Sequence, residues 1–136
     1  MKQQRGVALL EALLATVILA IGLLGAIGMQ ARAYSAMADA SMRAEATIAT
    51  ENLLGLMNND QSNLSAYALA PGATADQRLQ PWLDQTRSVI PNAVIGVVVT
   101  SAPDNKRSQI DITIQWTRKD NGARGKHAVT SHIAQS

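Results

Sequence analysis

The chain of 136 residues contains no cysteine and no phenylalanine. Without a thiol it has no cysteine nucleophile, no thiolate metal site and no disulfide. Its aromatic residues are Tyr34, Tyr67, Trp82 and Trp116. Only about 78 residues follow the long helix expected at the amino terminus, so they can bury only a small core by themselves. We therefore expect the carboxyl half of that helix to pack into the core.

Catalytic and cofactor motifs are also absent. The sequence has no G-x-S-x-G and no H-E-x-x-H. His127 and His132 are five residues apart, so in a strand they point to opposite faces and cannot bind one metal ion together. We interpret them as two solvated histidines. The segment GLLGAIG lacks the spacing of a dinucleotide-binding loop and follows no strand. We expect no enzyme activity, cofactor, metal or small-molecule substrate.

The charge of the chain gives no general argument for binding nucleic acid. The formal net charge is +2, but the 130 residues after Gly6 hold ten basic and ten acidic side chains. One turn is locally basic, and we interpret it as a solvated loop rather than a contact with DNA or another anionic partner. It contains Arg118, Lys119, Arg124 and Lys126, together with Asp120.

A long apolar run extends from Val7 to Met29. At about 1.5 Å per residue a helix of this length measures about 34 Å, which is enough to cross a hydrocarbon core of about 30 Å. Lys2 and Arg5 precede the run, and such residues tend to stay cytoplasmic, so we expect the rest of the chain in the periplasm. A cleaved signal peptide is the alternative, because a small-x-small sequence ends at Ala33. The apolar region of a signal peptide, however, is usually about 7 to 15 residues long and contains no acidic residue.

The apolar run contains a carboxylate, Glu11. A charged group at the centre of a membrane helix costs roughly 2.5 to 3.5 kcal/mol on insertion scales, so an acid there suggests a function and a partner. On a helix Glu11 lies on the same face as Val7, four residues earlier. Near the cytoplasmic interface its side chain can also extend into the headgroups without a specific role.

The segment RGVALLE resembles the type IV prepilin signature, with Gly6 before the cleavage point, Val7 first and Glu11 fifth in the mature chain. The resemblance implies a leader of residues 1–6 with Lys2 and Arg5 as its basic residues. It implies that a prepilin peptidase cuts after Gly6 and methylates the new amine of Val7. It also implies that Glu11 meets the amine of an adjacent subunit in the assembled filament. Val7 stands where phenylalanine is usual in that family, which does not prevent cleavage.

The continuation AIGLLGAIGMQ is most similar to PilV-type minor pilins, and Trp82-x-Leu83 with Ile90 to Ala93 resembles their middle segment. Major pilins often close their carboxyl-terminal region with a disulfide, so the lack of cysteine favours a minor subunit. Gly28 replaces a helix-kinking proline that is common in major pilins. Each glycine inside a helix costs about 1 kcal/mol relative to alanine, so Gly22, Gly25 and Gly28 should let the span bend or allow close approach of another helix.

The remaining pattern predicts an α+β fold of the type IV pilin-like kind, a long amino-terminal helix packed on a small antiparallel β-sheet. The helix is expected to continue to about Met57, with an apolar stripe facing the sheet, and Pro81 to Val89 to form a short helix. Strands are predicted at Val94 to Thr100, at Ile110 to Thr117, where isoleucine alternates with polar residues, and at Ala128 to Ile133. The stripe consists of Met42, Ala46, Ala49, Leu53 and Leu56.

We expect five segments: leader 1–6, membrane and assembly helix 7–29, periplasmic amphipathic helix 30–58, connecting loop 59–92 and antiparallel sheet 93–136. The expected function is that of a PilV-like minor pilin, acting in pilus assembly, adhesion and twitching motility. Its expected partners are the prepilin peptidase, other minor pilins, the major pilin, the inner membrane and a tip adhesin. A minor pseudopilin of a type II secretion system and a membrane-tethered periplasmic binding domain are the alternatives.

Overall fold

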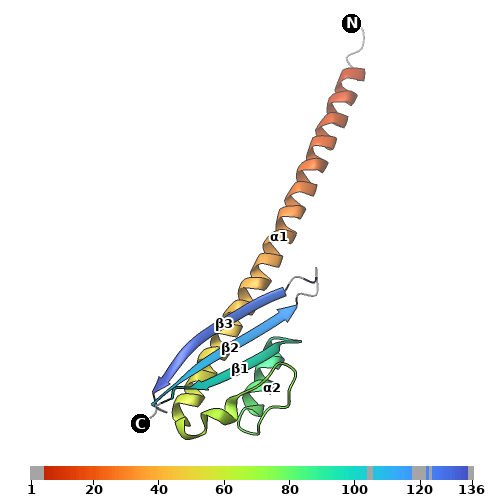
Figure 1. Cartoon of the computed structure of the whole chain (residues 1–136). Coiled ribbons are helices and arrows are strands. Elements are labelled where there is room, and N and C mark those ends of the chain that lie inside the picture. The colour runs from red at the N-terminus through yellow and green to blue at the C-terminus, as the bar shows by residue number, and fades with distance from the viewer. Residues whose placement is uncertain (1–4, 104–105, 118–121, 123, 135–136) are drawn as a thin grey trace. The chain divides into compact units, whose positions relative to one another are not determined.

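A computed structural model describes residues 5–103, 106–117, 122 and 124–134 of the chain, with the backbone alone for Arg5. Two predicted features lie partly outside the described residues: the basic leader with Lys2, and the basic turn with Arg118, Lys119 and Asp120. The chain divides into two compact units, Met1–Ala38 and Asp39–Ser136. Each unit is described by itself, with the element labels of Figure 1.

The first unit is helical from Arg5 onward. Its residues form the amino-terminal part of α1 (Arg5–Asn59). Leucine and alanine, which favour helix, dominate this segment, and no proline occurs in α1. The long amino-terminal helix predicted from the sequence is therefore confirmed.

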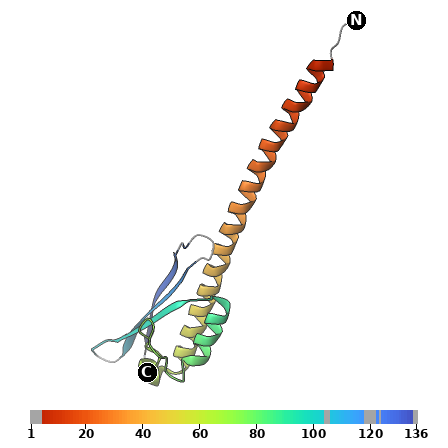
Figure 2. The ribbon, with the colours of Figure 1, turned by 90° about the vertical axis from the view of Figure 1, so that its right-hand side faces the viewer.

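The second unit has a layer of strands and a layer of helices. The strands β1 (Val94–Ser101), β2 (Arg107–Thr117) and β3 (Arg124–Ala134) form an antiparallel sheet in the order β1-β2-β3. The carboxyl part of α1 and the shorter α2 (Gln80–Val89) lie together on one side of this sheet (Figure 2). The predicted α+β fold with an antiparallel meander is thus confirmed, and β3 is longer than expected because it pairs with β2 along its whole length.

The inner face of the sheet is the face that the sequence alternation predicted. Ile110, Ile112, Ile114 and Trp116 of β2 are all at most 3% exposed, and they form one core with Ile95 and Val97 of β1. Burial of alternate side chains on one face is the expected pattern for a sheet covered by helices on one side. The register of β2 was therefore predicted correctly.

The stripe on α1 differs from the prediction at its carboxyl end. Ala46 and Leu53 are buried and Met42 and Ala49 are partly buried, as expected, but Leu56 is 46% exposed. Met57 takes the core position instead, because it follows Leu53 by four residues and so lies on the same side of the helix. Thr50 is also buried on this side, and its buried hydroxyl is satisfied because it donates a hydrogen bond to the carbonyl oxygen of Ala46 at 2.8 Å.

The segment between α1 and α2 is held together by the carboxylate of Asp60. It accepts hydrogen bonds from Asn63 Nδ2 at 2.6 Å and from the Tyr67 hydroxyl at 3.0 Å, and it pairs with Arg78 Nη1 at 2.8 Å. The hydrogen bond from Asn63, with those from Tyr67 and Arg78, holds the pKa of Asp60 below its ordinary value. The segment forms the short 3-10 helix η1 (Gln61–Tyr67) and then bridges to β1 through Leu69 and Val97.

Candidate functional site

The residues of the predicted processing site lie in the first two turns of α1. Gly6, Val7 and Glu11 are all exposed. Among the described residues, apart from the chain neighbours and the backbone of the helix itself, no atom lies within 4 Å of the position that a Cβ would take at Gly6. Helical geometry places Val7 and Glu11 on one face of α1. Cleavage after Gly6 and methylation of Val7 stay predictions, as do the roles of Lys2 and Arg5.

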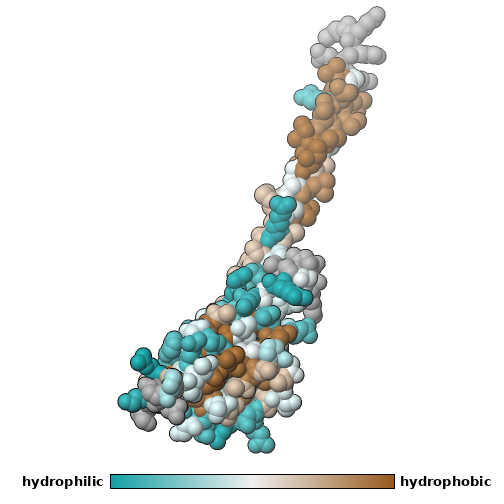
Figure 3. Space-filling model, viewed as in Figure 1, coloured by the Kyte–Doolittle hydropathy of each residue, from teal (hydrophilic) through white to brown (hydrophobic). Residues whose placement is uncertain are grey.

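The first unit exposes large apolar side chains around the whole circumference of the helix. They lie between 47% and 70% exposed from Val7 to Met29, and Figure 3 shows this hydrophobic surface on the face toward the viewer. A helix that is apolar on all sides is stable only when membrane or protein surrounds it. Within the described residues, one helix, Gly6–Asn59, is long and apolar enough to cross a membrane by length and composition.

Two polar side chains interrupt this apolar surface, Glu11 and Thr16. The hydroxyl of Thr16 donates to the carbonyl oxygen of Leu13 at 2.8 Å, so it is satisfied within the helix itself. Glu11 has no hydrogen bond or ion pair among the side chains that the structure describes. Because an ionised carboxylate in an apolar setting needs a partner, this position is the candidate site for a contact with a cation.

The three glycines of the span leave open space on the helix. Gly22, Gly25 and Gly28 all have helical conformation. In the part of the chain that the structure describes, no atom beyond the chain neighbours and the helix's own backbone lies within 4 Å of a Cβ built at any of them. A smooth helix surface of this kind allows close approach of another helix. That role, and the predicted flexibility of the segment, stay predictions.

The two histidines lie on opposite faces of β3, as their spacing predicted. His132 is exposed on the outer face, but His127 is half-buried on the inner face, where Gly125 and Ile133 are buried. The Nε2 atom of His127 is buried and has no hydrogen-bond partner among the described residues. The interpretation of two solvated histidines is therefore wrong for His127, because β3 extends farther toward its amino end than the sequence indicated.

The outer face of the sheet carries a polar network around Asp111. Its carboxylate accepts hydrogen bonds from Thr130 Oγ1 at 2.5 Å and from Gln109 Nε2 at 2.9 Å. The bond from Thr130, followed by that from Gln109, lowers the pKa of Asp111. Arg124 and Lys126 of the predicted basic turn are exposed on this strand pair. In the part of the chain that the structure describes, no three histidine, aspartate or glutamate side chains gather as a metal site would require.

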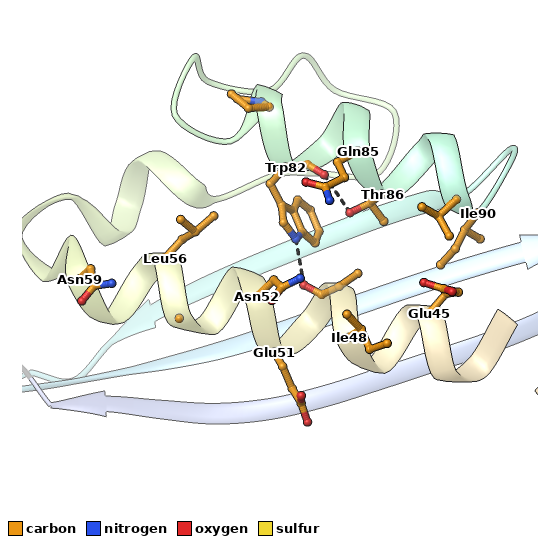
Figure 4. Close-up of a pocket in the computed structure, with 14 residues that line it drawn as sticks. Glu45, Ile48, Glu51, Asn52, Leu56, Asn59, Trp82, Gln85, Thr86 and Ile90 are labelled. Atoms are coloured by element: carbon orange, nitrogen blue, oxygen red, sulfur yellow. Dashed lines mark hydrogen bonds between the residues drawn. The ribbon is translucent and has the colours of Figure 1, made fainter. Parts of the chain in front are cut away.

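A groove of about 510 Å³ lies between α1 and α2 in the second unit (Figure 4). Trp82 forms part of its wall, and the indole Nε1 of Trp82 donates a hydrogen bond to the carbonyl oxygen of Ala49 at 2.8 Å. This bond fastens α2 to α1 across 33 residues of sequence. Ile48 and Leu56 on α1 and Val89 on α2 line the groove and are exposed. The groove was not predicted from the sequence, because Leu56 was expected on the sheet-facing stripe.

The comparison with known proteins gives a match for the amino-terminal segment alone. Residues 1–27 match the family model of the prokaryotic N-terminal methylation motif. No curated protein and no solved structure gives a significant match to the chain. The motif implies processing by prepilin peptidase and association with the membrane, whereas the PilV subfamily gains no support from the comparisons. The match to the methylation motif, with the apolar helix that follows it, indicates a type IV pilin-like or pseudopilin protein.

Proposed function

We propose that this chain is a minor pilin of a type IV pilus, a structural subunit of the PilV-like kind rather than an enzyme. The observation that carries the proposal is Glu11, a carboxylate without a described partner on an apolar helix surface, five residues into the chain that cleavage after Gly6 would leave. The amine of a neighbouring subunit's first residue is the cation that this site lacks. Away from water, each of the two charges costs less beside the other than it would alone.

In this proposal residues 1–6 are the leader, residues 7–29 the membrane and assembly helix, and residues 30–58 its periplasmic continuation. The connecting segment 59–92 and the sheet 93–136 form the periplasmic head before assembly and the cell-surface part afterwards. The subunit waits in the inner membrane and then enters the filament with the major pilin and other minor pilins. Through filament assembly it supports adhesion, with or without a tip adhesin, and twitching motility.

The test is the fate of the Glu11→Ala variant. Removing the charge makes the span more apolar and leaves Gly6 unchanged, so insertion and cleavage should remain normal. Incorporation should fail, because alanine offers nothing to the amine of a neighbour. We would measure the ratio of this subunit in sheared filaments to that in membranes, with the processed fraction as the internal control.

Two further variants sharpen the comparison. Glu11→Asp keeps the charge but shortens the side chain, so it should incorporate partially. Thr16→Ala removes the other polar side chain of the span, whose hydroxyl is already satisfied by Leu13, and should incorporate like the wild type. Equal incorporation of Glu11→Ala and wild type would contradict the pairing role. Absence of the wild-type chain from pili, with secretion lost on its deletion, would favour a pseudopilin of a type II secretion system.

A further inference from the structure

The groove between α1 and α2 is lined by large apolar side chains that are exposed to solvent. Ile48 is 52% exposed, Leu56 46% and Val89 43%, and Trp82 stands beside them, buried at 6% exposure. Exposed apolar side chains are ordinary when scattered, but a group of them in a concave site marks a contact surface. The volume of this concave site is about 510 Å³.

The lining of the groove follows one face of α1. Ile48, Asn52, Leu56 and Asn59 succeed one another at intervals of four and three residues, which places them in a row along the helix. Figure 4 shows this row beside α2, with Leu56 and Ile48 separated along the groove. Two helices that pack side by side leave a trough between them, and a third helix fits such a trough with its side chains at the same spacings.

Among the described residues that line the groove, the charged ones are all acidic. They are Glu45 and Glu51, and none of the described lining residues is a lysine, arginine or histidine. Glu45 lies at the end of the groove near Ile90, whereas Glu51 is at the rim and points away from α2 (Figure 4). Two copies joined through this face would bring the same carboxylates together, which disfavours self-association. A partner with basic side chains is complementary.

We propose that this groove binds an amphipathic helix of a different protein. Apolar side chains of that helix fill the space between Ile48, Leu56 and Val89, and a lysine or arginine on it lies beside Glu45. The inference goes beyond the proposed function and does not depend on it, since the groove belongs to the second unit and Glu11 to the first. If helix binding in the groove is disproved, the proposed role of Glu11 is unaffected, and the reverse also holds.

The decisive variant is Gly55→Leu. Gly55 lines the groove, and no described atom beyond its chain neighbours and the backbone of α1 lies within 4 Å of a Cβ built there. The helix therefore accepts a larger residue, while the groove loses its space. Leucine also favours helix more than glycine does, so the substitution should not unfold α1. Weaker binding by this variant would therefore not result from loss of folding. Thr47→Leu is the matched control, because Thr47 is exposed on α1 but does not line the groove. Ile48→Gln tests the same contact by removing an apolar side chain instead of adding one.

The experiment uses the full chain in lipid nanodiscs and two labelled synthetic peptides. Both peptides are helical with leucine at every third and fourth position, and their flanking residues are arginine in one and glutamate in the other. Fluorescence anisotropy should show binding of the arginine peptide, weakened about tenfold or more by both variants. Gly55→Leu fills the space that the peptide would occupy, and Ile48→Gln removes apolar contact area. Thr47→Leu should leave it unchanged. Glu45→Lys should reverse the preference between the two peptides.

Other outcomes would overturn the proposal. Equal affinity for the arginine and glutamate peptides would show that the carboxylates do not select the partner. Peptide binding that is the same for wild type and Gly55→Leu would show that the helix does not enter the groove. Sedimentation analysis that detects a wild-type dimer, abolished by Gly55→Leu, would assign the groove to a second copy of the chain.

Discussion

The indole ring of Trp116 fills the space in which a side chain at position 125 would begin. Trp116 and Gly125 are directly paired across β2 and β3, and a Cβ built at Gly125 collides with three atoms of the indole. The ring is 3% exposed, so it covers the glycine while forming part of the core. Glycine in a strand interior often marks such close approach, and here a cross-strand neighbour requires it.

Gly125→Ala should destabilise the head. The added methyl group displaces the Trp116 ring from a packed position, and overpacking of this kind costs about 1 to 3 kcal/mol. Urea unfolding of the full chain in nanodiscs, followed by tryptophan fluorescence, measures the change. Gly96→Ala is the control, because the nearest atom to a Cβ there is Pro71 Cγ at 3.4 Å. A Gly125→Ala protein as stable as Gly96→Ala would contradict the packing of Trp116.

Ile112→Asp and Thr113→Asp test the two faces of β2. Ile112 is 1% exposed in the core, and an unpaired carboxylate there should cost several kcal/mol. Thr113 points to the outer face and is only partly buried, so the same substitution should cost less than about 1 kcal/mol. The two unfolding midpoints in urea are compared with that of the wild type. Similar losses in both variants would mean that the register of β2 is wrong.

The carboxylate of Asp60 should make the stability of the head fall at low pH. Its pKa in the folded protein lies below the ordinary value of 3.8, chiefly because Asn63 donates a hydrogen bond to it. Such a group stabilises the fold fully above its unfolded pKa, and this contribution is lost as the pH falls through the lower folded pKa. In Asp60→Asn this loss is absent, while Asp111 contributes equally to both proteins.

We therefore expect the unfolding free energy of the wild type to fall more than that of Asp60→Asn when the pH drops below 3.8. Urea unfolding at a series of pH values measures both curves. Above that pH the wild type should be the more stable protein, because asparagine cannot pair with Arg78 as a carboxylate does. Parallel curves for the two proteins would show that Asp60 has no lowered pKa in the folded state.

The sequence predicted the elements that depend on local periodicity. The alternation through Ile110 and Trp116 identified the buried face of β2, and the apolar run from Val7 identified the helix of the first unit. The amino end of β3 was missed because Arg124 and Lys126 favour no strand by themselves; pairing with Thr117 and Gln115 of β2 places them there. Tertiary pairing overrides propensity at such positions.

The groove depends on contacts that no local pattern shows. Leu53, Leu56 and Met57 are all apolar, so spacing alone could not decide which of them face the sheet. The hydrogen bond from Trp82 to Ala49 joins α2 to α1 between residues that are far apart in the sequence. The candidate site at Glu11 was found because one charged residue in an apolar run is visible in the sequence itself.

The amino terminus of the mature chain is the most direct test of the central claim, that this protein is processed as a prepilin. The protein is purified from membranes of cells that make prepilin peptidase. Mass spectrometry of the intact protein then identifies its first residue. We predict a chain that starts at Val7 with a methylated amine, and an uncut precursor when Gly6 is replaced by leucine. A wild-type chain that starts at Tyr34, or normal processing of Gly6→Leu, would contradict the account.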